Sequence, residues 1–343
     1  MKSIKPVLYV VLVVVVITVM IPAMLVLPFS KGETGEKITD ESKQAKQPTL
    51  EVNQLEQSAV QVAVLRSANK QVSKLPLEKY IVGVVASEMP ADFELEALKA
   101  QALTARTYIV NKLMDGSKDA SLNGADVTDT VNHQVYKSDA ELKALWGADY
   151  DWKYKKVAQA VLETEGKIIT YGGKPITATF FSTSNGFTEN SEAIWESPYP
   201  YLKSVESPWD KQSPKFYDRK VMSVAQFEKQ LGVKIEGKTS IGSIIKRTPG
   251  KRVASVKING KVISGKDVRE TLDLKSTDFS WERKGDSVVI TTKGYGHGIG
   301  MSQYGANGMA KEGKNYEQIV KHYYSGIQIA SSASFAKKIV AQK

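Results

Sequence analysis

The sequence predicts an α+β fold, with mixed helices and sheet in two lobes that flank a substrate groove, after a single N-terminal transmembrane helix. Helical stripes with i, i+3, i+4, i+7 spacing occur between short alternating segments typical of strands, and the chain has no internal repeat. Hydrophobic residues make up 42% of the 343 residues, which is enough for a substantial core. The third observation is a long apolar run near the N-terminus.

This run, residues 7–29, is expected to be an uncleaved membrane anchor. It is interrupted only by Thr18, Pro22 and Pro28, and as a helix it would span roughly 34 Å, more than a hydrocarbon core of about 30 Å. A cleavable signal peptide is the alternative, but its apolar region is about 7–15 residues long and ends in a small-x-small site, which is missing here. Two lysines in residues 1–6 favour a cytoplasmic N-terminus with the following chain outside the cell membrane.

Composition limits the possible chemistry of the remaining chain. The sequence has no cysteine, which excludes disulfides, cysteine nucleophiles, cysteine-ligated zinc and a lipid-modified cysteine. Residues 30–55 are polar and are expected to form a flexible linker to an extracytoplasmic domain at residues 56–330. The net charge of +10 fits a soluble basic surface, an anionic wall polymer or a membrane surface, whereas nucleic acid is not an expected partner.

The first half of the domain reads as a strand followed by helices. Apolar residues from Leu77 to Val85 follow the spacing of one helical face, and Pro90 is expected to end this helix near Glu88. An alanine-rich helix follows. The expected elements are a strand at 58–65 and helices at 77–88, 94–114 and 154–164.

The second half is expected to contain a smaller inserted lobe at approximately residues 215–290 and to end in a C-terminal tail at 331–343. Two strands are predicted within 166–182 around a Gly-Gly pair, followed by a loop at 182–186 and extended chain at 199–205. The remaining expected elements are helices at 224–231, 302–311 and 316–323, and strands at 253–258 and 288–292.

A glycine-rich run, Gly294 to Gly300 with glycine at every second position, is the first candidate site. Four glycines in seven residues weaken any regular element, so the backbone is expected to turn sharply or to lie close against another segment. The run matches neither a dinucleotide-binding fingerprint nor a P-loop. His297, Ser302, Gln303 and Tyr304 suit a polar ligand such as a glycan, and a tight turn with an internally bonded histidine is the alternative.

Glu88 is the second candidate, because it continues the apolar stripe of its helix and therefore faces inward. Burial raises the pKa of a carboxyl group, and a general acid near neutral pH requires such a shift. The alternative is a structural ion pair with Arg106 on the next helix. A Gly-x-Ser-x-Gly elbow is absent, no pair of carboxylates can be selected for two-acid glycoside hydrolysis, and the three histidines lack a metal-binding spacing.

Three segments together resemble the stage II sporulation protein D family over roughly residues 58–329. The first reads Leu77-Glu-Lys-Tyr-Ile-Val-Gly-Val-Val-Ala-Ser-Glu-Met-Pro90 and continues through Ala97-Leu-Lys-Ala-Gln-Ala-Leu-Thr-Ala-Arg-Thr-Tyr108. The second is Phe181-Ser-Thr-Ser-Asn-Gly186 with the following Thr-Glu-Asn-Ser-Glu and Pro-Tyr-Leu-Lys-Ser-Val segments, and the third is Gly294 to Ala306.

The resemblance implies a membrane-anchored peptidoglycan lytic transglycosylase (a glycan-cleaving lyase) whose catalytic acid is Glu88. It implies cleavage between N-acetylmuramic acid and N-acetylglucosamine, with 1,6-anhydro ends, on strands stripped of stem peptides during septal wall thinning and engulfment in sporulation. Implied partners are stage II sporulation proteins P, an amidase, and M, in the engulfing mother-cell membrane. A non-catalytic wall-binding activator of a partner amidase is the alternative function. Expected substrate contacts are Arg106, Ser182, Ser184, Asn185, Tyr201, His297, Ser302, Gln303 and Tyr304.

The sequence departs from this family at one position. Many relatives carry a cysteine that can hold zinc in the segment corresponding to Thr130-Val-Asn-His-Gln-Val-Tyr136, and this chain has none. No metal and no cofactor are therefore expected, and His133 marks the place where a remnant of such a site would lie.

Overall fold

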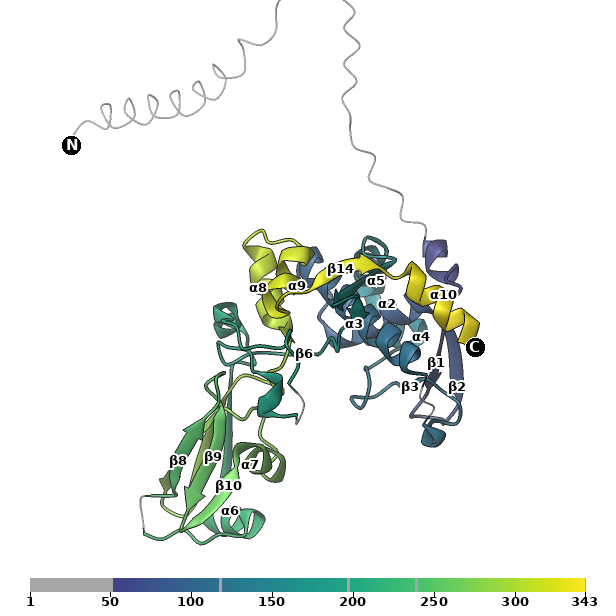
Figure 1. Ribbon diagram of the computed structural model, residues 1–343. Coiled ribbons are helices and arrows are strands. Elements are labelled where there is room, and N and C mark those ends of the chain that lie inside the picture. The colour runs from purple at the N-terminus through teal and green to yellow at the C-terminus, as the bar shows by residue number, and fades with distance from the viewer. Residues whose placement is uncertain (1–51, 117–118, 196–197, 238–239, 343) are drawn as a thin grey trace, which may run out of the picture. The chain divides into compact units, whose positions relative to one another are not determined.

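The computed structural model describes residues 52–116, 119–195, 198–237 and 240–342 (Figure 1). Within these ranges the chain is a mixed α+β protein with several small sheets, which confirms the α+β part of the predicted fold class. None of the helices in the described ranges is long and apolar enough to cross a membrane. The expected anchor at 7–29 and most of the linker at 30–55 lie outside the described residues.

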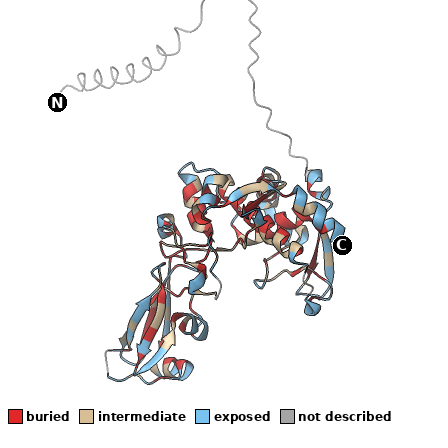
Figure 2. Ribbon diagram, in the orientation of Figure 1, coloured by how far each residue is buried: buried red, intermediate tan, exposed pale blue. Residues whose placement is uncertain are grey.

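A first hydrophobic core is built around helices α2 (Leu77–Glu88) and α3 (Leu95–Asp115). Most of α3 is buried on all sides, and its many alanines let neighbouring helices approach closely. Figure 2 shows buried residues concentrated in this region. The other helices and strands of this part are β1 (Gln61–Leu65), β2 (Val72–Pro76), β3 (Val127–Thr128), α4 (Asp139–Trp146), α5 (Tyr150–Leu162), β4 (Lys167–Tyr171), β5 (Lys174–Pro175), α8 (Gln303–Lys311), α9 (Tyr316–Tyr323), β14 (Gln328–Ser331) and α10 (Ala333–Gln342).

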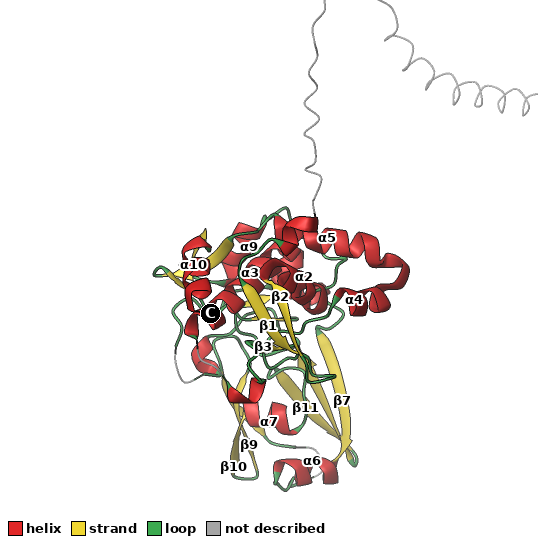
Figure 3. Cartoon of the chain, turned by 90° about the vertical axis from the view of Figure 1, so that its right-hand side faces the viewer, coloured by secondary structure: helices red, strands yellow, loops and turns green. Residues whose placement is uncertain are grey.

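A second hydrophobic core lies within residues 222–290, inside the segment expected as a smaller inserted lobe. Two antiparallel sheets of strand order β10-β9-β8 and β11-β12-β7 pack with two short helices, as Figure 3 displays. Phe227, Val256 and Ile290 are among its fully buried side chains. The elements are β7 (Tyr217–Ser223), α6 (Val224–Leu231), β8 (Ser243–Arg247), β9 (Val253–Ile258), β10 (Lys261–Ser264), α7 (Gly265–Thr271), β11 (Phe279–Lys284) and β12 (Ser287–Lys293).

The chain between the two cores brings distant segments together. Strand β13 (Met301–Ser302) pairs in parallel with β6 (Phe180–Phe181), and Thr183 forms an antiparallel bridge with Tyr295. Single-turn 3₁₀ helices occur at Val52–Glu56, Ala120–Leu122, Gly147–Asp149, Ser191–Ala193 and Pro208–Gln212. The glycine-rich run therefore lies directly beside the loop that follows β6.

The predicted helices at 77–88, 224–231 and 316–323 have the same bounds in the structure, because each carries a clear apolar stripe and end signals. Residues 331–343, expected only as a tail, hold the end of β14 and helix α10. Ile339 of α10 is buried, and the helix packs against α3. Its single buried apolar residue gave too weak a periodic signal to be recognised.

Candidate active site

Glu88 is the last residue of α2, and the chain turns into extended conformation at Met89 directly before Pro90. The predicted helix end is confirmed, since the residue before proline is biased away from helical angles. This position leaves the carboxyl group at the end of a buried helix, where it is only partly covered. At this position the carboxyl group lies in surroundings of low polarity and is still accessible to a ligand.

The hydrogen bonds of Glu88 leave one carboxyl oxygen available. Oε1 accepts a hydrogen bond of 2.8 Å from the backbone N–H of Val135, and among the described residues no side chain or backbone group bonds to Oε2. Burial raises the pKa of Glu88, while the Val135 N–H and the charge of Lys137 oppose part of this shift. Burial is the largest of these influences, so Glu88 holds its proton to higher pH than an exposed glutamate.

The segment carrying Val135 reaches Glu88 because α2 has a glycine on the facing side. A Cβ atom at Gly83 would lie 2.3 Å from the ring of Tyr136 and 2.6 Å from the carbonyl oxygen of Lys137. Any larger residue at this helical position would push the segment outward. Gly83 thus sets the close packing that delivers the Val135 N–H to the carboxylate.

The glycine-rich run packs against the segment around β6, which confirms the expected close backbone approach. Gly296 and Gly300 both have positive φ, at 117° and 81°. A Cβ atom would lie 2.9 Å from the Cβ of Phe181 at Gly296, and 2.1 Å from the carbonyl oxygen of Thr179 at Gly300. Both conformation and space therefore require glycine at these two positions.

His297 of this run is neutral over most of the pH range. Burial and the charges of Arg269 and Arg252 lower its pKa to about 4. Nδ1 accepts a hydrogen bond of 3.0 Å from the backbone N–H of Ile299, so the ring proton of the neutral form is assigned to Nε2. The bonded histidine of the alternative interpretation is therefore present, yet the same ring also faces a cavity.

That cavity is a groove of about 520 Å³ that contains Glu88. Among the described residues that line it, Glu88 is the only carboxylate, and the other ionisable groups are Tyr108, His133, Lys215, Arg269, Tyr295 and His297. Of the predicted site residues, the groove brings together Glu88, Ser182, His297 and Gln303. Gln303 also donates a hydrogen bond of 3.0 Å to the backbone carbonyl of Glu88, which ties the glycine-rich run to the end of α2.

The structure places Arg106 elsewhere, in a buried ion pair with Glu78. The Arg106 Nη2 to Glu78 Oε2 distance is 2.6 Å, and further Arg106 N–H groups donate to the backbone carbonyls of Val161 and Thr164. Its side chain is fully buried, so it has no donor left for a substrate. The alternative ion pair between Arg106 and Glu88 is therefore wrong, and Arg106 belongs to the framework of the site.

Ser184 and Ser302 also belong to the framework, because the buried Asp210 binds both. Its carboxylate accepts hydrogen bonds from Ser184 Oγ at 2.7 Å, from Ser302 Oγ at 2.6 Å and from Ser207 Oγ. Ser302 is in addition the N-cap of α8. Asp210 thus fastens the loop after β6 to the end of the glycine-rich run, and neither serine lines the groove.

Three further predicted contacts lie outside the groove. Asn185 is buried and donates to the backbone carbonyl of Gly250 and to Asp278, which attaches the second core to the loop after β6. Tyr201 is buried, and its hydroxyl accepts a hydrogen bond from the Thr177 N–H. The half-buried ring of Tyr304 packs edge-on against Phe93. These side chains position the groove rather than line it.

Sequence reasoning missed two groove residues with features suited to a sugar. Tyr295 is 39% exposed, and its ring lies below the ammonium groups of Lys215 and Lys275 at 5.4 and 5.7 Å. Gln134 is buried, and its Nε2 has no hydrogen-bond partner. The only available signal for Tyr295 was its place between Gly294 and Gly296 in the glycine-rich run.

His133 lines the same groove, and Thr128 bonds its Nδ1 atom. The Thr128 hydroxyl lies 2.9 Å from this nitrogen, and burial lowers the pKa of the ring. Across the described ranges no group of three or more histidine, aspartate or glutamate side chains is placed to hold a metal ion.

The fold and groove define a class of protein: a mixed α+β chain whose site joins several separated sequence segments around one half-buried carboxyl group. The model of a family described as stage II sporulation protein matches residues 66–171. Stage II sporulation protein D of Bacillus subtilis is 51% identical over 94% of this chain and 95% of its own length, and that of Bacillus amyloliquefaciens is 50% identical over 99% and 100%. The chain belongs to the stage II sporulation protein D family of sporulation proteins.

A more distant relative extends the comparison. A Bacillus subtilis protein named amidase enhancer is 31% identical over 73% of this chain and 40% of its own length. It therefore matches this chain over less than half of its own sequence.

Proposed function

We propose that this protein is a membrane-anchored lytic transglycosylase that cleaves peptidoglycan glycan strands between N-acetylmuramic acid and N-acetylglucosamine. The observation that carries the proposal is the groove in which Glu88 is the single carboxylate among the described lining residues and has a pKa raised by burial. A hydrolase of the two-carboxylate type needs a second acid to activate water or to act as nucleophile. A lytic transglycosylase needs only one carboxyl group, because the substrate provides its own nucleophile.

In the proposed reaction, protonated Glu88 donates its proton to the glycosidic oxygen while the bond from that oxygen to C1 of the muramic acid breaks. The carboxylate then accepts the proton of the C6 hydroxyl of the same sugar as its oxygen bonds to C1, which gives a 1,6-anhydro end. Oε2, which is free of protein hydrogen bonds, suits this exchange. The released glycan carries the first proton, and Glu88 ends protonated as it began.

The remaining groove residues suit an uncharged sugar chain. Ser182 supplies a hydroxyl group, and the ring of His297, neutral above its pKa of about 4, lines the groove without competing for the proton of Glu88. The exposed ring of Tyr295 offers a flat face for a pyranose. In this proposal the two lobes formed around the two hydrophobic cores flank the substrate groove.

The cellular setting is part of the same proposal. Residues 7–29 would anchor the chain in the cell membrane with the domain outside, in the engulfing mother-cell membrane. Stage II sporulation proteins P and M are the proposed partners, and the relative named amidase enhancer supports a link to a wall amidase. That amidase would supply the peptide-stripped strands on which the groove acts.

The test is to incubate the full chain with amidase-treated peptidoglycan and to search for anhydromuramyl ends by mass spectrometry. We expect Glu88→Gln to lower the rate by about 10²- to 10⁴-fold, since it removes the general acid. Asp92→Asn, an exposed carboxylate four residues further along, is the matched control and should retain full activity. Absence of anhydro ends, or their persistence in Glu88→Gln, would sink the proposal.

The second candidate is a non-catalytic wall-binding activator of an amidase, favoured by the same relative. The Glu88→Gln variant separates the two functions, because an activator does not require a proton donor. If this variant stimulates a partner amidase as strongly as the parent protein and neither produces anhydro ends, the activator function is the correct one.

A further inference from the structure

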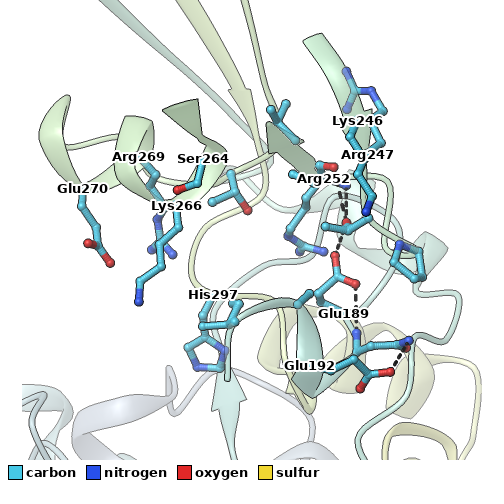
Figure 4. Close-up of a pocket in the computed structure, with 18 residues that line it drawn as sticks. Glu189, Glu192, Lys246, Arg247, Arg252, Ser264, Lys266, Arg269, Glu270 and His297 are labelled. Carbon is cyan, nitrogen blue, oxygen red and sulfur yellow. Dashed lines mark hydrogen bonds between the residues drawn. The ribbon is translucent and has the colours of Figure 1, made fainter. Parts of the chain in front are cut away.

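A second cavity of about 550 Å³ opens beside the Glu88 groove, and its lining is strongly basic (Figure 4). The two cavities share Arg269 and His297 in their walls. Figure 4 shows Lys266 and Arg269 of the α7 segment on one side of this basic pocket and Lys246 and Arg247 of β8 on the other. The basic pocket therefore adjoins the Glu88 groove at these two residues.

Most of the cations in the basic pocket lack an anionic partner. Arg247 pairs with Asp278 at 3.0 Å, whereas no carboxylate of the described residues lies within ion-pair distance of Lys246, Lys266, Arg269 or Arg252. Unpaired cations gathered in one cavity create a positive potential. This charge reaches the neighbouring groove, because Arg269 and Arg252 both contribute to the lowered pKa of His297.

Arg252 provides a second, independent sign of a missing ligand. It is only 2% exposed, yet its Nε has no hydrogen-bond acceptor, although its Nη1 donates to the backbone carbonyl of Phe187. Native proteins satisfy nearly all buried donors, so an orphaned guanidinium N–H in a cavity wall calls for a ligand or a water molecule. Gly298 leaves room for this group, since a Cβ there would lie 2.4 Å from its Cζ.

The carboxylates in the pocket wall do not satisfy these cations. Thr248 and the backbone N–H groups of Gly250 and Asn190 bind Glu189, and Lys203 binds Glu192 at 3.0 Å. Glu270 is the remaining carboxylate of the lining, at the end of α7. Cations that face open space therefore outnumber free anions in this wall.

We propose that the basic pocket is an anion-binding subsite that takes the free lactyl carboxylate of a muramic acid residue in the glycan strand. The inference rests on the proposed function, because it is the glycan of the Glu88 groove that continues into this pocket. In a peptide-bearing strand the same carboxyl group is an uncharged amide, so the pocket distinguishes stripped from peptide-bearing glycan. Guanidinium and ammonium donors suit a carboxylate, with which they form charge-assisted hydrogen bonds.

The experiment measures binding to the full chain carrying Glu88→Gln, which prevents turnover. Calorimetry compares a peptide-free glycan oligosaccharide with the same oligosaccharide after conversion of its carboxylates to methylamides. We expect the carboxylate form to bind about tenfold more tightly, and the double variant Lys246→Gln/Lys266→Gln to remove most of this difference. Lys229→Gln, an exposed lysine on α6 of the same lobe, is the matched control and should retain it.

Equal affinity for the two oligosaccharides, or an unchanged preference in the double variant, would overturn the inference. A third ligand, poly(glycerol phosphate), tests a phosphate polymer as the source of the anion. Displacement of the glycan by this polymer at lower concentration than by free glycan would also overturn it. If the parent protein produces no anhydro ends but carboxylate-dependent binding persists, the proposed function fails while this subsite stands.

Discussion

Helix α2 carries a glutamate near each end, and the two residues have opposite surroundings. Glu78 in the first turn is 3% exposed and forms an ion pair with Arg106. Glu88 in the last turn is partly exposed, accepts one backbone hydrogen bond, and has no cation within ion-pair distance among the described residues. A glutamate side chain is thus held in a buried ion pair at the start of α2, whereas the glutamate at its end remains accessible to a ligand.

The difference follows from what each helix end meets. The start of α2 lies against α3 and the end of α5, where Arg106 also donates to the backbone carbonyl groups of Val161 in α5 and of Thr164 just beyond it. The end of α2 lies against the Val135 segment and Gln303, which supply only neutral donors. Burial without a cation raises the pKa of a carboxyl group, and at Glu88 this effect outweighs the opposing hydrogen bond from the Val135 N–H. The glutamate that we propose as the general acid is therefore the one without an ion-pair partner among the described residues.

Replacement of Arg106, the cation paired with Glu78, is expected to have the largest effect on the free energy of unfolding. Arg106→Met leaves a buried carboxylate and the backbone carbonyl groups of Val161 and Thr164 without their donor, which should lower the free energy of unfolding by about 3–5 kcal/mol. Urea denaturation followed by circular dichroism measures this loss. Glu88→Gln should change the same quantity by less than about 1 kcal/mol, because its side chain is partly exposed and glutamine retains the acceptor for Val135.

The double variant Glu78→Leu/Arg106→Met is the control for this comparison. It removes both charges together, so part of the lost stability should return. A loss in Glu88→Gln as large as that in Arg106→Met would show that both glutamates are structural and would remove the contrast between the helix ends.

The second-largest effect on stability is expected at Gly83, which lies in α2 between Glu78 and Glu88. Gly83→Ala should lower the free energy of unfolding by about 1–3 kcal/mol, because the new methyl group collides with the ring of Tyr136. In an open helix the same change would stabilise the protein by about 1 kcal/mol. The sign of the change in thermal or urea denaturation therefore decides whether the segment is packed as tightly as the structure has it.

Gly83→Ala also tests the link to Glu88. Displacement of the segment would lengthen the hydrogen bond from the Val135 N–H and should reduce glycan cleavage. An alanine variant that is stabilised and fully active would contradict the role of this glycine in shaping the site.

Local signals in the sequence predicted much of the first core and the position of Glu88. The apolar stripe and Pro90 defined α2, and the alternating glycines predicted the close backbone approach that Gly300 makes to Thr179. These features depend on residues adjacent in sequence. The choice between Glu78 and Glu88 as the partner of Arg106 depends instead on how α3 and α5 pack, which no local pattern encodes.

The same limit applies to the polar framework and the basic pocket. Asp210 accepts hydrogen bonds from Ser184 and Ser302, which lie 26 and 92 residues away in sequence. The hydroxyl groups of these two predicted substrate contacts are therefore already bonded within the protein. A serine in a polar loop looks identical in sequence whether it faces a ligand or a buried carboxylate. Lys246, Lys266 and Arg252 likewise gather from β8, α7 and the start of β9 only when the second core folds.

The smallest expected effect is a shift in the pH dependence of the reaction in which Glu88 is the proposed acid. The acid form of Glu88 is the proposed proton donor, so kcat/KM should fall as pH rises through its pKa, which burial holds above the usual 4.5. The charge of Lys137 opposes this shift, so Lys137→Gln should raise the pKa and move the alkaline limb of the pH–rate profile to higher pH. His297, with a pKa of about 4, should affect only the acid limb.

The pH dependence of folding stability should have the same direction as that of the reaction. Because the folded-state pKa of Glu88 is raised, its protonated form favours folding, and this contribution is complete below about pH 4.5 and is lost as pH rises through the folded-state pKa. Lys137→Gln should extend it to higher pH, as urea denaturation across a pH series would measure. Lys143→Gln, an exposed lysine on α4, should leave both profiles unchanged. If the alkaline limb of the Lys137→Gln profile stays in place or moves to lower pH, a group other than Glu88 controls the reaction. Glu88 would then not be the general acid, and the proposed contrast with the structural Glu78 would fail.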